Sequence, residues 1–118
     1  MFLTSTVKAP VVCICGSTKF KMAWEHVHQK LEKAGIVTLG VSSYTHFDHI
    51  PISPDEKKVV DQLHLQKIEM ADVVVVVNVE GYMGESTKEE VEYAYRLGKL
   101  VLFLQGTTTQ DSPPYQAA

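Results

Sequence analysis

The sequence predicts a single-domain α/β protein with a three-layer, flavodoxin- or Rossmann-like fold and a four- to five-stranded parallel sheet. Short apolar runs alternate along the chain with segments of helical spacing, which is typical of a parallel sheet covered by helices. One of these runs is five consecutive valines, Val73–Val77, and such a run indicates a strand buried on both faces. A length of 118 residues suits one domain with one core.

The first half of the chain contains two predicted strands with a helix between them. Val11–Cys15 is the first strand, and a helix is predicted over Lys19–Ala34, where apolar residues recur near helical spacing. Gly35 is placed to end this helix. A short second strand, Ile36–Leu39, is followed by the long loop Gly40–Pro54. A loop of this length is more often a binding loop or lid than a simple connection.

The second half repeats the alternation. Ser53 is a predicted N-cap with proline next to it and two acids in the first turn, so a helix begins there and runs to about Met70. The remaining predicted elements are a strand at Asp72–Val77, a helix at Ser86–Leu97 and a strand at Leu100–Leu104. We expect residues 1–104 to form the domain and residues 105–118, which are rich in Thr, Gln, Ser and Pro, to form a C-terminal tail.

Right-handed crossovers favour the strand order 2-1-3-4. In that order the chain reverses direction between strands 1 and 3, and ligands of open α/β sheets bind at such a point, beyond the carboxyl ends of the strands. The crevice there is predicted to lie between Gly16–Thr18 and the segment Asn78–Ser86.

Composition excludes several classes of function. The net charge is −3 and the pI about 5.9, which argues against a binder of nucleic-acid polymers. No run approaches the roughly 20 apolar residues of a membrane span, and the first ten residues do not have the pattern of a signal peptide, so we expect a cytoplasmic protein. Cys13 and Cys15 lie on the same side of a strand; two buried thiols are favoured, because Cys-x-Cys alone is weak support for a metal and lacks redox spacing.

The turn Gly16-Ser17-Thr18-Lys19 is a candidate anion site. Glycine lets the backbone approach a ligand, and the amides at the start of the following helix favour phosphate or carboxylate. The alternative is an ordinary strand–helix turn with a Ser or Thr N-cap. The Gly-Lys-Ser ending of a P-loop is missing.

Glu90 is the leading catalytic candidate. It lies at the edge of the core-facing side of its helix, so its carboxylate can point into the crevice. We expect the nearby helix N-terminus to keep it ionised, which suits attack on, or stabilisation of, an oxocarbenium-like sugar carbon. The alternative is a solvated surface glutamate. Its neighbour Glu89 forms a predicted capping box with Ser86.

The helix before the third strand carries Asp61, His64 and Lys67 on one face. A histidine between an acid and a lysine suits acid–base chemistry, and the alternative is an exposed polar stripe. Asp72 begins the third strand at the end away from the crevice, so a structural role is favoured.

The long loop contains two further sets of candidates. His46, Asp48 and His49 form a possible but weakly indicated metal site, because their spacing is irregular. Tyr44 and Phe47 offer a flat surface for a base.

Three segments resemble the nucleoside 2-deoxyribosyltransferase superfamily, which includes the 2′-deoxynucleoside 5′-phosphate N-hydrolases. They are Val12–Ser17, Ala71–Val77, and Gly84–Ala94 with Gly98–Leu102, and together they cover most of residues 11–104. The resemblance implies that Glu90 is the nucleophile at C1′ of a nucleoside or its 5′-monophosphate, that His64 assists departure of the base, that no metal or other cofactor is required, and that the protein forms a homodimer or larger homo-oligomer. The substrate-binding residues that it and the crevice indicate are Gly16, Ser17, Thr18, Lys19, Asn78, Gly84, Glu85 and Ser86.

The chain departs from the family pattern at two places. His64 stands where the family often has an aspartate, and Lys88–Glu92 replaces a glycine-rich stretch around the glutamate. These departures leave open a second interpretation, a nucleotide-binding or sensing module without catalysis. A receiver-type signalling domain is rejected, because Cys15 and Gly16 stand where that fold needs acids.

Overall fold

The computed structural model describes residues 8–105. Its centre is a four-stranded, all-parallel sheet in the order β2-β1-β3-β4. The strands are β1 (Val11–Gly16), β2 (Val37–Leu39), β3 (Val73–Val77) and β4 (Leu100–Phe103). The predicted fold class and strand order are therefore confirmed, with four strands.

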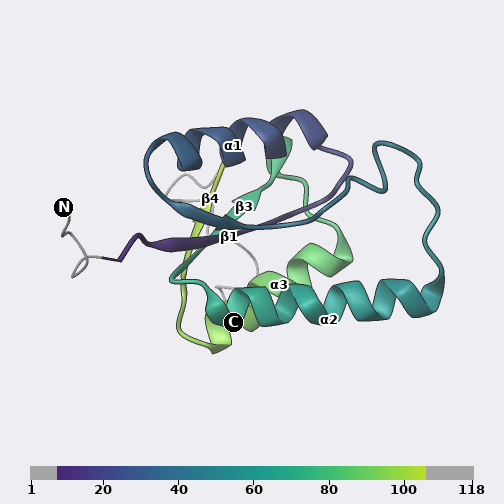
Figure 1. Ribbon diagram of the computed structural model, residues 1–118. Coiled ribbons are helices and arrows are strands. Elements are labelled where there is room, and N and C mark those ends of the chain that lie inside the picture. The colour runs from purple at the N-terminus through teal and green to yellow at the C-terminus, as the bar shows by residue number, and fades with distance from the viewer. Residues whose placement is uncertain (1–7, 106–118) are drawn as a thin grey trace.

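Helices cover both faces of this sheet (Figure 1). The helix α1 (Lys21–Lys33) lies on one face, and α2 (Pro54–Met70) and α3 (Glu85–Arg96) lie on the other. A short 3₁₀ turn, η2 (Val79–Gly81), follows β3. Because alternate residues of a strand point to opposite faces, β1 sends Ile14 into the core under α1, and Cys13 and Cys15 into the core under α2 and α3.

The two helices that border the crevice begin differently. At α2 the prediction is confirmed: the Ser53 hydroxyl accepts from the Glu56 amide (3.1 Å), and the Glu56 carboxylate accepts from the Ser53 amide (3.0 Å). At α3 the predicted capping box is wrong. The helix begins one residue earlier than expected, with extended Gly84 as its N-cap and without a side-chain cap, so Ser86 is already inside the first turn.

The start of α1 also differs from the prediction. The helix begins at Lys21 and not at Lys19, because residues 17–20 form a turn in which the Phe20 amide donates to the Ser17 carbonyl (3.2 Å). Asp72 has the expected structural role. Its carboxylate accepts from the Val11 amide at 2.8 Å, and its own amide donates to the Val11 carbonyl at 2.7 Å, which joins β1 to the start of β3.

The first residue of the predicted tail, Gln105, is in contact with the domain. Two hydrogen bonds join it to Asn78. The Asn78 side chain donates to the backbone carbonyl of Gln105 (2.7 Å) and accepts from the backbone N–H of Gln105 (2.9 Å). The rest of the predicted tail, 106–118, lies outside the described residues. Within residues 8–105, no helix has the length and apolar character needed to cross a membrane.

Candidate functional site

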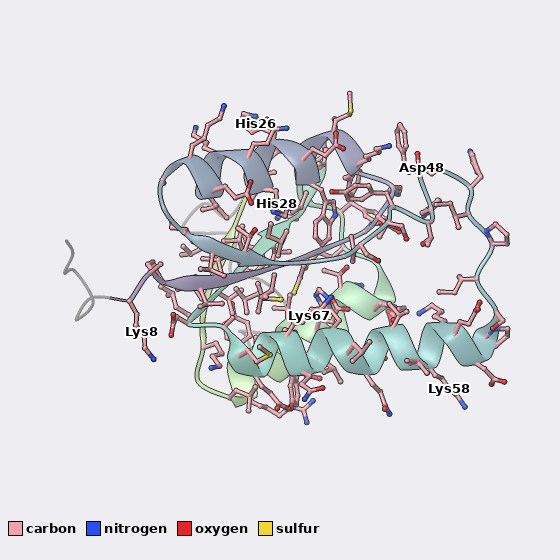
Figure 2. The ribbon with its side chains drawn as sticks, in the orientation of Figure 1. Lys8, His26, His28, Asp48, Lys58 and Lys67 are labelled. Atoms are coloured by element: carbon pink, nitrogen blue, oxygen red, sulfur yellow. The ribbon has the colours of Figure 1, made fainter. Side chains whose placement is uncertain are left out.

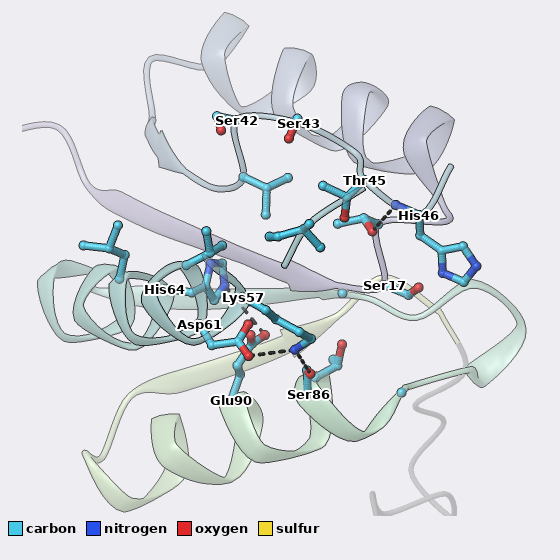
Figure 3. A pocket seen from close by; sticks show the side chains of 18 of the residues that line it. Ser17, Ser42, Ser43, Thr45, His46, Lys57, Asp61, His64, Ser86 and Glu90 are labelled. Atoms are coloured by element: carbon cyan, nitrogen blue, oxygen red, sulfur yellow. Dashed lines mark hydrogen bonds and ion pairs between the residues drawn. The ribbon is translucent and has the colours of Figure 1, made fainter. Parts of the chain in front are cut away.

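A cavity of about 460 Å³ opens at the carboxyl edge of β1 and β3, between the loop after β2 and the helices α2 and α3. Its volume falls within the usual range for small-molecule sites. Eight of the ten predicted site residues line it: Gly16, Ser17, Thr18, His64, Gly84, Glu85, Ser86 and Glu90. Figure 3 shows Ser42, Ser43 and Thr45 on one wall, facing His64, Glu90 and Ser86 on the other.

Gly16 sets the spacing of the two strands at the floor of the cavity. Its φ is +152°, and a Cβ at this position would lie 2.8 Å from the Val77 carbonyl oxygen, a distance that forces the backbones apart. Ser17 and Thr18 follow in the turn. The Ser17 carbonyl accepts from the Trp24 indole N–H (3.0 Å), and the Thr18 hydroxyl accepts from the His46 amide (3.1 Å). The turn therefore joins β1 to both α1 and the long loop.

Two predicted binding residues do not line the cavity. Lys19 instead places its ammonium 3.5 Å from the centre of the Tyr82 ring and 5.2 Å from that of Phe20, a cation–π arrangement. Asn78 is buried, and its side-chain amide is occupied by the backbone of Gln105. Sequence reasoning placed both at the crevice from their position after a strand, which does not determine where a side chain points.

Glu90 projects from α3 into the cavity, and its side chain is 15% exposed. Burial raises the pKa of its carboxyl to about 7, against the opposing effect of nearby His64. The expectation that the helix N-terminus keeps this group ionised is therefore wrong in direction. Glu90 is the sixth residue of α3, and the helix-terminus effect fades within the first turn, so desolvation prevails.

His64 is buried against Glu90 and two thiols. Its Nε2 lies 3.7 Å from Glu90 Oε1, 3.3 Å from Cys15 Sγ and 3.8 Å from Cys13 Sγ. Burial by itself lowers the pKa of His64, but the hydrogen bond with Cys13 and the charge of Glu90 outweigh it, and the net shift is upward. The exposed-stripe alternative does not hold for this residue.

Cys13 and Cys15 are buried, as predicted. The hydrogen-bonding interaction between them lowers the pKa of Cys13 to about 6 and, together with burial, raises the pKa of Cys15 well above its usual value. Among residues 8–105, one group of three His, Cys, Asp or Glu side chains has ligand atoms mutually within 4.8 Å, and it consists of Cys13, Cys15 and His64.

The rest of the α2 wall is charged. Asp61 and Lys67 share the cavity with His64, as the predicted stripe requires. Lys67 donates to the Gly40 carbonyl (2.6 Å) and so ties α2 to the start of the long loop; Figure 2 shows it on the inner side of α2, whereas Lys58 points outward. Lys57 donates to Asp61 (2.7 Å) and to the Ser86 hydroxyl (3.4 Å).

The long loop lines the cavity, but of the residues predicted in it only His46 is among the lining residues. Tyr44 packs edge-on against Trp24 at 6.1 Å between ring centres, and neither it nor Phe47 is among the lining residues. Asp48 pairs with Lys21 at 3.2 Å, so the three candidates in the loop form no metal-ligand group in the part of the chain described. Beside His46 the loop contributes the hydroxyls of Ser42, Ser43 and Thr45.

Sequence reasoning missed Lys57 and the three loop hydroxyls. Lys57 was detectable, because it lies four residues before Asp61 and seven before His64 and so shares their helical face. The loop hydroxyls had no such signal, since irregular backbone gives no period from which an orientation follows.

Comparisons with known proteins leave the function to be argued from this geometry. A scan against models of known protein families finds no match to the chain, and a search of curated proteins finds none either.

Proposed function

We propose that the protein cleaves or transfers the N-glycosidic bond of a nucleoside or nucleoside 5′-monophosphate, with Glu90 as nucleophile. This is the activity of the nucleoside 2-deoxyribosyltransferase superfamily that the sequence resembles. One observation carries the proposal: a nearly buried carboxylate, Glu90, lies beside an imidazole, His64, in a ligand-sized cavity at the reversal point of the sheet.

The walls of the cavity support a substrate with an apolar end and a polar end. Backbone and hydroxyl groups at Gly84–Ser86 begin α3, where helix amides favour a phosphate, and the Lys57 ammonium lies next to Ser86. Apolar side chains from three elements form the other part of the wall and suit a base: Trp24, Val41, Ile52, Val60 and Leu63.

The proposed reaction has two steps. The ionised Glu90 carboxylate attacks C1′, the C1′–O bond forms as the C1′–N bond breaks, and the departing base takes a proton from His64. Water, or a second base, then attacks C1′ and releases Glu90, and the proton of the attacking group returns to His64. Water gives a hydrolase and a base gives a transferase.

A base-release assay tests this proposal. The full chain, Glu90→Gln and the matched control Glu89→Gln are incubated with nucleosides, deoxynucleosides and their 5′-monophosphates, with and without an acceptor base. We expect release or exchange by the wild type and by Glu89→Gln, which changes an exposed neighbour, and a loss on the order of 1000-fold in Glu90→Gln. A glycosyl adduct on Glu90, seen by mass spectrometry with a slow substrate, would identify the nucleophile directly.

The competing candidate is a nucleotide-binding module without catalysis. The upward shift of the Glu90 pKa to about 7 favours it, because a carboxyl that is partly protonated at neutral pH is a weaker nucleophile. Saturable binding of a nucleotide that survives in Glu90→Gln, with no base released by the wild type across the panel, would establish the module and exclude the enzyme.

We further propose that the protein acts as a cytoplasmic homo-oligomer. Apolar side chains of α2 that do not line the cavity are exposed at Val59 and Met70, and a second copy would cover them. Sedimentation of the wild type and of a Val59→Glu variant tests this: the variant is expected to sediment as the smaller species, and a wild type that is monomeric at every concentration would contradict the proposal.

A further inference from the structure

We propose that Cys13, Cys15 and His64 form a binding site for a thiophilic divalent cation, Zn²⁺, beneath the floor of the cavity. These side chains come from adjacent positions on one face of β1 and from α2, about fifty residues later in the chain. All three are buried, and their ligand atoms lie mutually within 4.8 Å. The inference does not depend on the proposed N-glycosidic reaction.

The two sulfur–nitrogen distances match an edge of a zinc tetrahedron. Zinc binds thiolate sulfur and imidazole nitrogen at bond lengths that make a sulfur–nitrogen edge of about 3.6 Å. The corresponding distances from His64 Nε2 are 3.3 Å to Cys15 Sγ and 3.8 Å to Cys13 Sγ. A single nitrogen atom thus faces both sulfurs, as a shared metal requires, and the two-residue spacing on a strand keeps the thiols on the same side.

A fourth position is available on the cavity side. Glu90 Oε1 lies 3.7 Å from His64 Nε2, but it is not among the ligand atoms that lie mutually within 4.8 Å, so it borders the fourth position and does not fill it. Water from the cavity can take this position, as in the Cys₂His sites that zinc accepts. Both His64 and Glu90 line the cavity, which gives the ion a path to sulfurs that are themselves fully buried.

The chemistry of the ligands selects the ion. Two thiolates and an imidazole favour Zn²⁺ and disfavour Mg²⁺ and Ca²⁺, which take oxygen ligands. Since His64 also belongs to the proposed catalytic pair, a bound zinc ion and a glycosidic substrate would compete for it.

Cobalt substitution tests the site directly. The full chain is stripped of metal with a chelator, titrated with Co²⁺, and then back-titrated with Zn²⁺. We expect one equivalent of Co²⁺ to give the sulfur-to-cobalt charge-transfer band and the intense ligand-field bands of a tetrahedral site, and Zn²⁺ to abolish them. The chain contains two cysteines in all, Cys13 and Cys15, so a thiolate band in the unaltered protein can come from no other residues.

Variants assign the ligands. Cys15→Ser and His64→Asn are each expected to weaken Zn²⁺ binding by more than about 100-fold, since even the loss of outer partners of a metal site costs up to that amount. His26→Asn, on the outer face of α1 (Figure 2), is the control and should bind as the wild type does. Octahedral Co²⁺ without a thiolate band, or no stoichiometric binding by the unaltered chain, would overturn the proposal whether or not the variants fold.

Discussion

The buried cores on the two faces of the sheet differ in their chemistry, although the same strands contribute side chains to both. Under α1 the buried core consists of Ile14, Trp24, Val27 and Val77. Under α2 and α3 the strand β1 contributes two thiols, and the helices add His64 and the Glu90 carboxyl next to the apolar residues. One face is therefore apolar in its buried core, and the other holds ionisable groups at its centre.

This contrast divides two tasks between the layers. Apolar burial stabilises the fold, whereas burying a carboxyl, an imidazole and thiols costs free energy unless they are mutually paired. The α1 face can accordingly hold the sheet rigid while the opposite face keeps groups with shifted pKa values close together, which is the usual condition of a functional site. The four predictions below test this division.

The largest effect is expected on the α1 face. Trp24 is 1% exposed, and its indole N–H donates to the Ser17 carbonyl at 3.0 Å. Trp24→Ala should lower the free energy of unfolding by about 3–5 kcal/mol, measured by urea denaturation, because it leaves a large cavity and removes the hydrogen bond from the indole. Met22→Ala, on the same helix at 71% exposure, is the control and should change it by less than about 0.5 kcal/mol. Equal losses of stability in Trp24→Ala and Met22→Ala would contradict the idea that the apolar core under α1 stabilises the fold.

On the opposite face a substitution should stabilise the protein. The pKa of Glu90 is about 7 in the folded state against 4.5 ordinarily, so the folded state binds the proton more tightly and the wild type loses stability as the pH rises from 4.5 to 7. Glu90→Gln in metal-free protein should therefore be more stable than wild type by on the order of 2 kcal/mol above pH ~7. The gain should vanish below the unfolded pKa. Urea titrations across this pH range measure it, and a gain independent of pH would show that packing, not charge, is responsible.

A smaller effect is expected where α2 holds the long loop. Lys67→Met removes the hydrogen bond from the ammonium to the Gly40 carbonyl while keeping most of the packing volume. The loss should be about 1–2 kcal/mol. Hydrogen exchange of the loop amides and affinity for the proposed nucleotide ligand should both change, whereas Lys58→Met, which alters an exposed residue of the same helix, should affect neither.

The smallest effect is expected at the N-termini of α2 and α3, where the two helices are capped differently. Ser53→Ala removes the capping box of α2 and should cost about 1 kcal/mol of stability by thermal or urea unfolding. Ser86→Ala should cost less than about 0.5 kcal/mol, since α3 has no side-chain cap. A larger loss of stability for Ser86→Ala would indicate that Ser86 does cap α3, as the sequence suggested.

The sequence predicted the architecture because its signals are periodic. The valine run, the helical stripes and the Ser53-Pro54 start each follow a repeat or local rule, and all correspond to observed elements. Glu90 and His64 were found in the same way, from the helical faces on which they lie. The predictions that were wrong concern contacts between residues far apart in the sequence. The side chains of Asn78 and Lys19 contact Gln105 and Tyr82 and do not line the cavity. The pKa of Glu90 is set by its burial in the folded protein.

The meeting of Cys13 and Cys15 with His64 had a partial signal. Their shared side of the strand followed from the two-residue period, but the third ligand is supplied by α2, 49 residues after Cys15. The crossing of α2 over β1 sets that contact, and a one-dimensional pattern does not specify which turn of the helix lies above which residue of the strand.

The parallel sheet also has a mechanical consequence. The described chain enters β1 at the amino edge and leaves β4 at the carboxyl edge, and both strands flank β3. Tension applied between residues 8 and 105 therefore acts along the strands in opposite directions, which shears the backbone ladders and loads their hydrogen bonds together instead of peeling them one by one. The Asn78–Gln105 clamp lies at the exit point and takes the load first. Single-molecule pulling between residues 8 and 105 should give a high rupture force in the wild type and a lower one in the Asn78→Ala variant.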